Sequence, residues 1–382
     1  MKVSSLLNLI PKKDLEFLAV DTKVDYQVSK LTGISIFRLI LFSMICSNRN
    51  SLRVMENFYN SIVFKSFAQI GNKTTRFTSI RDRIVTINAE FFEKIFLLLF
   101  EKFSHLLNET KSITRFDSTM VAVSAVFFNW GMKVGTKTNK GQMKFTIGMK
   151  GSLPCHVSIF KTQESFSEEK TIPKAIFQHK PKSEDIVVFD RGVQKRGTFV
   201  EFTNENIQFV TRLNTDAHYK IVSENKLKSK PKNATATIKK DYIVHLRSDH
   251  KWIEVPMRLI IATIDESGEE IYFLTNIEKL AAYDIAFIYK QRWDIEVLFK
   301  FLKQELNLSH LVSRTENGIR VMIYMTLIVA ILLIAYKKLN KLEGYKIPKL
   351  KFGNELEAQI IKDIVIRCGG NPAKMPHLFS DS

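Results

Sequence analysis

The strongest constraint on this chain is an uninterrupted apolar run near its end, VMIYMTLIVAILLIAY, from Val321 to Tyr336. A helix that crosses a membrane needs about 20 apolar residues. This run has 16 residues, includes Tyr324 and Thr326, and is flanked by basic residues. We therefore predict a helix that is buried in a protein core, and no membrane association.

The first 105 residues show helical periodicity throughout. Segments such as SIFRLILFSMIC and EFFEKIFLLLFEKFSHLL carry apolar residues at spacings of three and four, which is typical of amphipathic helices. Ser79 is a candidate N-cap for a short helix that carries Arg81 and Arg83. We predict a helical DNA-binding domain over residues 1–105 with Arg81 and Arg83 as its DNA contacts. The alternative is a helical domain whose arginines are simply solvated.

From about residue 111 the periodicity changes to that of strands. SITRFDSTMVAVS alternates, and KFTIGMKG, CHVSIFKT, DIVVFDRG and NIQFVTRLN follow as further strands. EEKTIPKAIFQHK is either a crossover helix or a turn, and the lysine-rich NKLKSKPKNATATIKK is expected to be an exposed loop. Two long helices are expected near 279–307 and 315–339. The predicted fold class is therefore α/β, with a mixed sheet, helices and an all-α N-terminal domain.

The helix expected at 279–307 contains YKQRWDIEVLFKFLK, in which polar residues keep to one side. At about 3.6 residues per turn, Tyr289, Arg292, Glu296 and Lys303 fall within an arc of roughly 60°. Such a stripe suits a phosphodiester, because the carboxylate can hold a metal ion and the other groups can hold phosphate oxygens. The alternative is a ladder of salt bridges on a solvated helix face.

Two aspartates are placed where α/β folds carry catalytic groups. Asp117, in ITRFDST, lies within or at the end of the first predicted strand, and Asp190 ends the buried strand IVVFD. Gly192 follows and permits a close backbone turn. If the fold brings Asp117, Asp190 and Glu296 together, their oxygens suit a pair of Mg²⁺ or Mn²⁺ ions. For each aspartate alone, an N-cap or a turn role is the alternative.

The charge balance points to a polyanionic partner. The chain has 57 Lys plus Arg against 39 Asp plus Glu, a formal net charge of +18, which favours nucleic acid over a membrane surface. Four lysines on or near a predicted hairpin could hold phosphates, although solubilisation is the alternative for any one of them. They are Lys133, Lys137, Lys140 and Lys144.

Cysteine usage and the N-terminus favour a reducing, cytoplasmic compartment. The three cysteines, Cys46, Cys155 and Cys368, are far apart and form no CxxC pair. Neither a zinc knuckle nor a disulfide framework is therefore expected. The N-terminal MKVSSLLNLIPKKDLEF lacks the long apolar core and the cleavage site of a signal peptide.

Together these residues resemble the DDE transposases of bacterial insertion sequences, in the branch marked by Y-x2-R-x3-E-x6-K. The resemblance rests on Asp117, on Asp190 with the following Arg191 and Gly192, and on the polar stripe. FVTRLN and YFLTNI also resemble strand segments of that branch. The resemblance covers about residues 105–340 and implies a ribonuclease H-like core with a β-rich insertion. We divide the chain accordingly into a helical DNA-binding domain (1–105), the catalytic core (106–213 and 271–340), the insertion (214–270) and a C-terminal helical tail (341–382).

The resemblance also implies roles for individual residues. Asp117, Asp190 and Glu296 would be the catalytic residues and would bind two Mg²⁺ or Mn²⁺ ions. The DNA contacts would come from Tyr289, Arg292, Lys303 and Arg191. Trp252, in the insertion, is a candidate by location for stabilising a flipped base when relatives form a DNA hairpin; a cross-strand core residue is the alternative.

The implied activity is cut-and-paste transposition. The enzyme would cleave the ends of an insertion sequence and join them to target DNA, acting on double-stranded terminal repeats in the bacterial nucleoid, as a homodimer in the synaptic complex. One alternative is a ribonuclease H-like nuclease without strand transfer. Another is a DNA-binding regulator that has no catalytic activity.

Overall fold

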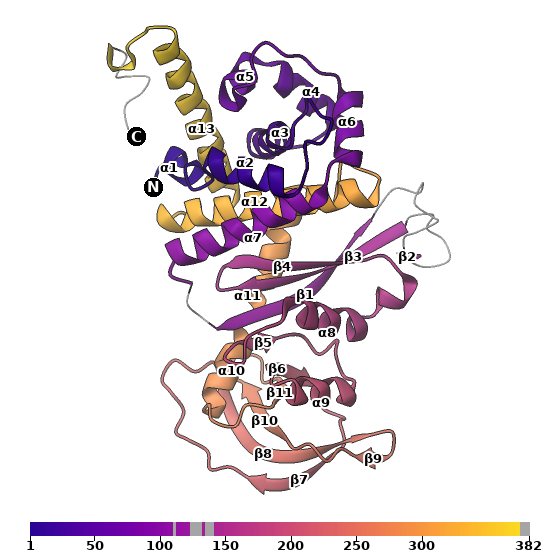
Figure 1. Ribbon diagram of the computed structural model, residues 1–382. Coiled ribbons are helices and arrows are strands. Elements are labelled where there is room, and N and C mark those ends of the chain that lie inside the picture. Colours follow the sequence, from indigo (N-terminus) through magenta and orange to yellow (C-terminus); the bar gives the residue numbers. More distant parts are fainter. Residues whose placement is uncertain (110–111, 123–131, 134–140, 375–382) are drawn as a thin grey trace. The chain divides into compact units, whose positions relative to one another are not determined.

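The structure is a computed structural model that describes residues 1–109, 112–122, 132–133 and 141–374. The chain forms two compact units (Figure 1). The helical unit combines residues 1–109 with residues 300–382, and the sheet unit comprises residues 110–299. The division into smaller domains stays a prediction; the compact units place both ends of the chain in the helical unit.

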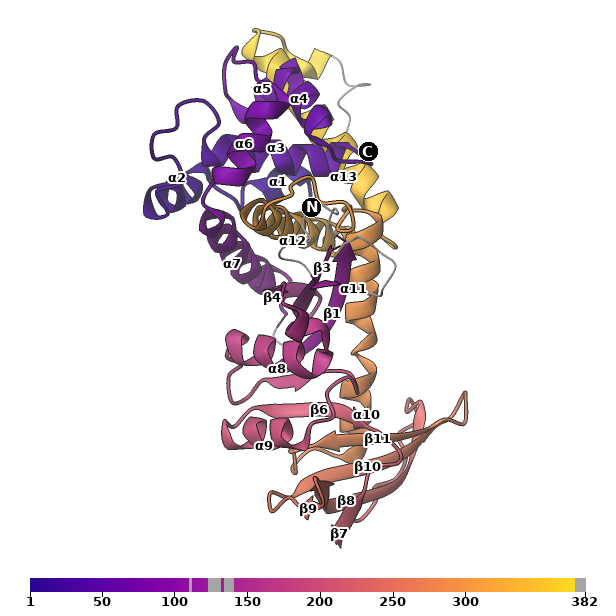
Figure 2. The same cartoon turned by 90° about the vertical axis from the view of Figure 1, so that its right-hand side faces the viewer.

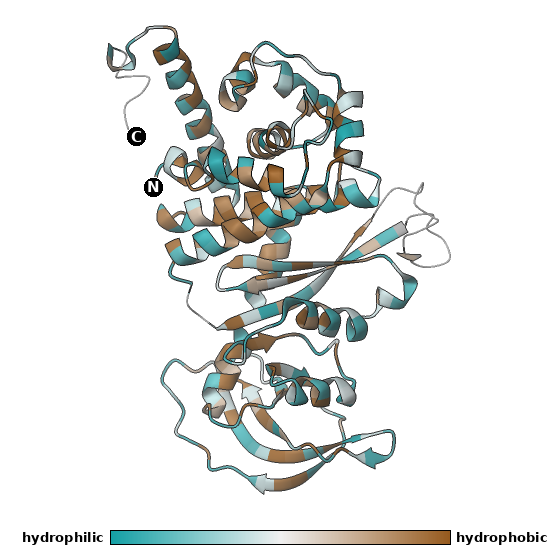
Figure 3. Ribbon diagram, viewed as in Figure 1, coloured by the Kyte–Doolittle hydropathy of each residue, from teal (hydrophilic) through white to brown (hydrophobic). Residues whose placement is uncertain are grey.

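The helical unit is built around one apolar helix. Its helices are α1 (Val3–Leu7), α2 (Lys12–Asp21), α3 (Gly33–Cys46), α4 (Leu52–Asn60), α5 (Ile62–Ala68), α6 (Phe77–Thr86), α7 (Ala89–Leu106), α12 (Glu316–Leu339) and α13 (Lys346–Arg367). Helix α12 contains the apolar run and contacts α3, α6, α7 and α13. By length and composition it could cross a membrane, but 94% of its most apolar window is buried. The predicted core helix is confirmed, and the middle turns of α7 and α12 are hydrophobic (Figure 3).

Some helices in this unit start at a local cap and others at a tertiary contact. The Ser51 hydroxyl accepts a hydrogen bond from an N–H group in the first turn of α4. Ser79 lies inside α6, so the expectation that it caps this helix is wrong. The carboxylate of Glu56, in α4, instead accepts a hydrogen bond of 3.0 Å from the Phe77 N–H group at the start of α6. A search for local caps cannot detect such a contact.

The sheet unit contains one large mixed sheet. Its strands are β1 (Ile113–Ala122), β2 (Met132–Lys133), β3 (Gly141–Lys150), β4 (Leu153–Phe160), β5 (Ile186–Val188), β6 (Gln208–Leu213), β7 (Tyr219–Glu224), β8 (Ala236–Ser248), β9 (Lys251–Trp252), β10 (Met257–Ile264) and β11 (Glu270–Thr275). The main path runs β2-β3-β1-β5-β6-β11-β10-β8-β7, with β4 paired to β3 and β9 paired to β8. Strand β1 is antiparallel to β3 and parallel to β5, which is parallel to β6. The predicted α/β class is confirmed.

Helices cover both faces of this sheet (Figure 2). On one face, α8 (Glu168–His179) and α9 (Arg196–Asn204) share an apolar cluster with Val187. On the other face, α10 (Ala282–Lys290) packs with the next residue, Val188. Successive side chains of a strand point to opposite faces of the sheet, so neighbouring residues of β5 pack against helices on opposite faces. The segment that the sequence left open between helix and turn is helix α8.

The strands of the expected insertion extend the same sheet. Strands β7, β8 and β10 continue it from β11, which pairs with β6. This part of the sheet unit is therefore joined to the central strands by backbone hydrogen bonds. The lysine-rich stretch predicted to be an exposed loop, residues 225–240, is a mostly exposed loop only over residues 225–235. Its last five residues begin strand β8, where Ala236 and Ile238 are buried, so that part of the prediction is wrong.

A buried ion pair ties these outer strands to the segment that leads into α10. Arg258, in β10, donates to both oxygens of Asp241, in β8, at 2.9 and 2.7 Å. The same guanidinium donates to the backbone carbonyls of Ile277, Glu278 and Leu280 at 3.2, 3.0 and 2.6 Å. Both side chains of the pair are almost fully buried, so the contact fixes the start of α10.

We expect Arg258→Ala to lower the free energy of unfolding by about 3–5 kcal/mol, because it leaves the Asp241 carboxylate buried without its cation. Urea unfolding followed by circular dichroism measures the change. Lys240→Ala, which breaks the exposed pair with Glu224, is the control and should cost less than about 1 kcal/mol. Equal effects of the two substitutions would contradict the assignment.

Candidate active site

The strand register brings Asp117 and Asp190 level with each other. In the parallel pair of β1 and β5, Ile113 lies opposite Ile186 and Arg115 lies opposite Val188. Continuing this register places Asp117 opposite Asp190, and neighbouring strands are about 4.8 Å apart. By alternation both side chains belong to the sheet face that α10 covers.

Each aspartate is held by its own backbone. Asp117 accepts a hydrogen bond from the Ser118 N–H group at 2.7 Å. Asp190 accepts one from the Arg191 N–H group. Asp190 follows the carboxyl end of β5, and Asp117 lies in the middle of β1, just beyond the last residues that pair in parallel with β5.

The polar stripe lies on two helices instead of one. Helix α10 ends at Lys290, and α11 (Trp293–Gln304) begins after a turn at Gln291 and Arg292. Hydrogen bonds between residues three apart close this turn, such as the bond of 2.9 Å from the Arg292 N–H group to the Tyr289 carbonyl. The predicted single helix over 279–307 is therefore wrong.

A buried arginine from β1 explains the break. Arg115 donates to the side-chain oxygen of Gln291 at 3.0 Å and pairs with Asp294 at 3.5 Å. It thus contacts the turn between α10 and α11 and the first turn of α11. The apolar periodicity of the segment continues through the turn, so the pattern alone gives no sign of the break.

The Arg292 guanidinium lies among the acids. It donates to Glu296 Oε1 at 2.6 Å and lies 3.9 Å from Asp117 Oδ2. Its side chain and that of Asp117 are 14% and 15% exposed, whereas that of Glu296 is 34% exposed. The charge of Asp190 also acts on Arg292. Without a metal ion, Arg292 supplies the positive charge that these carboxylates share.

Burial shifts the protonation of the site. It raises the pKa of Asp117 to about 6, and the charges of Glu168 and Asp190 add to this, against the Ser118 N–H group and Arg292. Burial also raises the pKa of Tyr289 to about 12. The Tyr289 hydroxyl is buried and interacts with Arg292, while its ring packs on Phe273 with centroids 5.3 Å apart.

The chemistry of these side chains fits a hard divalent cation, but they do not form a ready cage. In the described part of the chain, no three His, Cys, Asp or Glu side chains are arranged to hold an ion. The Glu296 carboxylate is paired with the Arg292 guanidinium. Carboxylate oxygens are the ligands that Mg²⁺ and Mn²⁺ prefer. An ion at this site would have to displace Arg292 from Glu296.

The other predicted DNA contacts lie outside this cluster. Arg191 follows Asp190 and is exposed, and Lys303 lies in the part of α11 that belongs to the helical unit. Trp252 is 47% exposed, so it is not a core residue. It pairs across β8 and β9 with Arg247, whose guanidinium lies 5.8 Å from the ring centroid.

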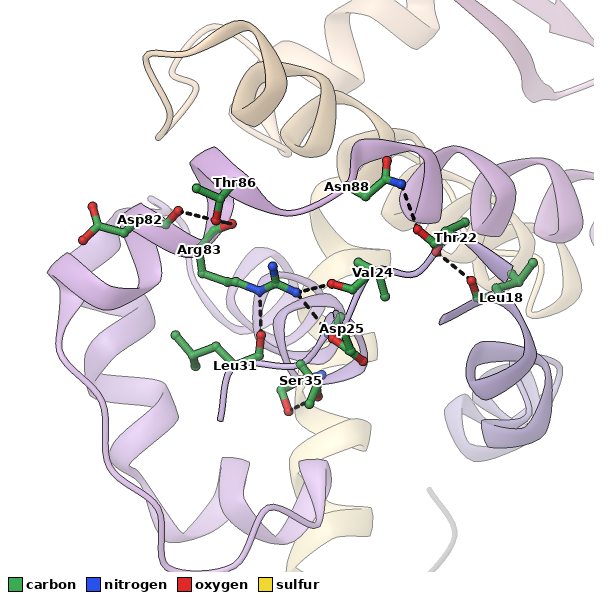
Figure 4. Close-up of polar contacts among 12 residues, drawn as sticks. Leu18, Thr22, Val24, Asp25, Leu31, Ser35, Asp82, Arg83, Thr86 and Asn88 are labelled. Atoms are coloured by element: carbon green, nitrogen blue, oxygen red, sulfur yellow. Dashed lines mark hydrogen bonds and ion pairs between the residues drawn. The ribbon is translucent and has the colours of Figure 1, made fainter. Parts of the chain in front are cut away.

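The two arginines of α6 have different environments. Arg81 is exposed and contacts its neighbour Asp82 at 2.8 Å. The guanidinium of Arg83 points into the helical unit, where it donates to the carbonyls of Leu31 and Val24 at 2.8 and 2.6 Å (Figure 4). Its side chain is 11% exposed. Arg83 thus supports the fold of this unit, and Arg81 is the one of the pair that is accessible to DNA.

Among the hairpin lysines, Lys137 and Lys140 lie outside the described residues. Lys144 is only 4% exposed and donates to the Phe166 carbonyl, so it is not a surface contact. Sequence reasoning missed two groups near the acids, Arg115 and Glu168. Neither carries a local signal, because both reach the site only through the pairing of β1 and the position of α8.

Comparison with known proteins identifies relatives of this chain. Residues 108–332 match the family model described as "Transposase DDE domain". A putative transposase, y4zB, of Sinorhizobium fredii is 31% identical over 184 residues, which cover 47% of each chain. A probable transposase for insertion sequence element IS5377 of Geobacillus stearothermophilus is 29% identical over 153 residues, covering 40% of this chain and 39% of that protein. The chain thus spans less than half of these curated relatives.

A solved structure, the cryo-EM structure of a piggyBac transposase synaptic complex with hairpin DNA, was also found. It has a TM-score of 0.46 and 13% sequence identity, covering 90% of this chain and 74% of that chain.

The raised pKa of Asp117 predicts a gain in stability on removing its charge. Below the ordinary pKa of an aspartate, the Asp117 carboxyl is protonated in both the folded and the unfolded chain. Between about pH 4 and pH 6, it keeps its proton only in the folded chain. The folded state therefore loses stability relative to the unfolded state as the pH rises through this range. The variant Asp117→Asn does not lose this stability, because an asparagine side chain carries no charge at any of these pH values. We expect it to stabilise the metal-free protein by up to about 3 kcal/mol at about pH 8, and by much less at about pH 4.

Urea unfolding in EDTA measures this difference, and Asp284→Asn, on an acid in the first turn of α10 that is exposed, is the control. A variant at position 117 that is no more stable than the wild type at the higher pH would contradict the burial of this charge.

Proposed function

The chain belongs to the transposase DDE domain family, and on this basis we propose that it cuts the ends of an insertion sequence and joins them to target DNA. The observation that carries the proposal is the level placement of Asp117, in β1, and Asp190, just after β5, with Arg292 linking Asp117 to Glu296. All three acids lie within the matched segment, residues 108–332.

We assign the sheet unit to the ribonuclease H-like fold. In support, β4, β3 and β1 are antiparallel neighbours, and β1, β5 and β6 are parallel neighbours. The strands of residues 214–270 lie between Asp190 and Glu296 in the chain, where the Y-x2-R-x3-E-x6-K branch carries its insertion. The spacing of Tyr289, Arg292, Glu296 and Lys303 agrees with that signature.

In this proposal Asp117, Asp190 and Glu296 hold two Mg²⁺ or Mn²⁺ ions. When bound, such ions activate the attacking water or 3′-hydroxyl and stabilise the leaving oxygen. The protein's own part is to position these groups. Arg292, once released from Glu296, binds a phosphate oxygen of the strand end, because a guanidinium matches phosphate geometry. The Tyr289 hydroxyl donates to the same strand, and burial keeps it protonated.

The DNA partners in this proposal are the double-stranded terminal repeats and the target. The net charge of +18 supports attraction to the phosphate backbone. Arg191, Lys303 and Arg81 are proposed phosphate contacts, and Trp252, which is exposed, is proposed to stack on an unpaired base. Two ends must be joined, so a homodimer on DNA in the cytoplasm is proposed. A nuclease without strand transfer and a DNA-binding regulator are the alternatives.

Removing the Glu296 carboxylate separates catalysis from binding. We expect Glu296→Gln to lower cleavage of a labelled element end in Mg²⁺ by more than about a hundredfold, because a metal ligand is lost. Binding of the same DNA, measured by mobility shift, should stay near the wild-type level. Glu266→Gln, in an exposed turn, is the control and should cut normally. Full cleavage by the Glu296 variant would remove the proposed mechanism.

A joining assay with a pre-cut 3′ end tests strand transfer itself. The wild type should join the end to a plasmid in Mg²⁺. Arg292→Ala and Lys303→Ala should each lower joining by about tenfold or more, the cost of one charge-assisted contact to phosphate. Their melting temperatures should fall far less than activity does. Cut ends that are never joined would favour the nuclease, and parallel losses of stability and activity would favour a salt-bridge role.

A further inference from the structure

A groove runs between α8 and α9, on the sheet face opposite α10 (Figure 2). It has a volume of about 630 Å³ and is lined by residues of both helices. Pro173 and Phe177, from α8, belong to its lining, and the Phe177 ring packs on Phe202 of α9 with centroids 5.3 Å apart. The α8–α9 groove therefore lies on the packed seam between two helices.

Four exposed lysines line this groove: Lys170, Lys174, Lys180 and Lys195. Lys170 and Lys174 are one turn apart, so they project from the same side of α8. Lys195 immediately precedes the first residue of α9. Among the residues that the structure describes, none of the four ammonium groups forms an ion pair. These charges are therefore available to an anion from outside the chain.

Positive charge is in excess in the groove, because its lining contains two acids, Glu169 and Glu201, against the four lysines. Both carboxylate oxygens of Glu169 are directed at the backbone, where they accept hydrogen bonds from the Gln194 and Lys195 N–H groups at 2.7 and 2.9 Å. A cleft lined mainly by one sign of charge concentrates ions of the opposite sign. The groove thus favours a polyanion.

We propose that the α8–α9 groove binds the phosphate backbone of the target duplex, the DNA into which the cut ends are joined. The inference rests on the proposed function. Lysine ammonium groups hold phosphates as point charges, and such contacts carry no information on base sequence. This property suits a target better than a terminal repeat, which has to be distinguished by its sequence.

The position of the groove also separates it from the strand end. The proposed contact of Tyr289 with that strand lies on the sheet face that α10 covers, whereas the groove lies on the face that α8 and α9 cover. A strand end held beside α10 therefore leaves the groove to a second segment of DNA.

Fluorescence anisotropy of a labelled duplex that contains no element end tests this assignment, with the full-length protein at several salt concentrations. We expect the double variant Lys170→Ala, Lys174→Ala to bind the duplex about tenfold more weakly. The slope of log affinity against log salt concentration should become shallower by about 2, because two phosphate contacts are lost.

Two control variants separate the groove from net charge alone. The double variant Lys230→Ala, Lys240→Ala removes the same charge from lysines that are paired with Asp265 and Glu224 at 2.8 and 3.5 Å, and it should bind nearly as the wild type does. The double variant Lys170→Arg, Lys174→Arg keeps the charge of the groove and should also bind normally.

Cleavage and joining assays then distinguish the target from the element end. The variant with alanine at positions 170 and 174 should cut a labelled element end in Mg²⁺ as the wild type does. It should join a pre-cut end about tenfold more slowly when the plasmid target is below saturation. Equal losses of cleavage and joining would overturn the assignment to the target.

Duplex binding no weaker than that of the Lys230 and Lys240 control would overturn the role of the groove and leave the proposed function standing. A wild-type protein that neither cuts nor joins would overturn the proposed function, and the anisotropy measurement would still decide whether the groove binds duplex DNA.

Discussion

Close carboxylates repel one another, and the arrangement of the candidate site depends on how that repulsion is balanced. Asp117 is largely buried beside Asp190 and Glu168, and burial with these charges raises its pKa to about 6. Arg292 supplies the opposing charge at 3.9 Å from Asp117 and 2.6 Å from Glu296. The metal-free site is thus held together by a cation on the protein. A divalent ion could bind these carboxylates only by displacing the Arg292 guanidinium from them.

This balance explains why the segment between α10 and α11 is bent. Arg292 lies in the turn itself, where residues three apart are hydrogen-bonded. Arg115 holds the turn through Gln291 and the start of α11 through Asp294. One straight helix would place Tyr289 and Glu296 on a common stripe. The turn instead gives each its own helix, with Arg292 between them.

The sequence predicts the parts of this site that are local and misses those that depend on tertiary contacts. The apolar run of α12 and the buried strand β5 follow from periodicity and composition, although β5 ends at Val188, two residues before Asp190. The composition predicts an exposed loop that runs to Lys240, but β8 already starts at Ala236. The break before α11 could not be predicted, because it depends on a buried arginine from a strand more than a hundred residues earlier in the chain. The role of Arg83 could not be predicted for the same reason. The sequence indicates a DNA contact, but the guanidinium donates to backbone carbonyls of a loop that is distant in the chain.

The outer strands have a mechanical role in the same arrangement. Because β8 and β10 continue the central sheet through β11, backbone pairing connects the buried pair of Asp241 and Arg258 to the strands next to which the aspartates lie. Arg258 in turn grips three carbonyls just before α10. The helix that presents Tyr289 is therefore fixed at its start by this pair and at its end by Arg115. Glu296 follows directly after that second anchor, so the distance between the strand acids and the helix acid is set by contacts at both ends of α10.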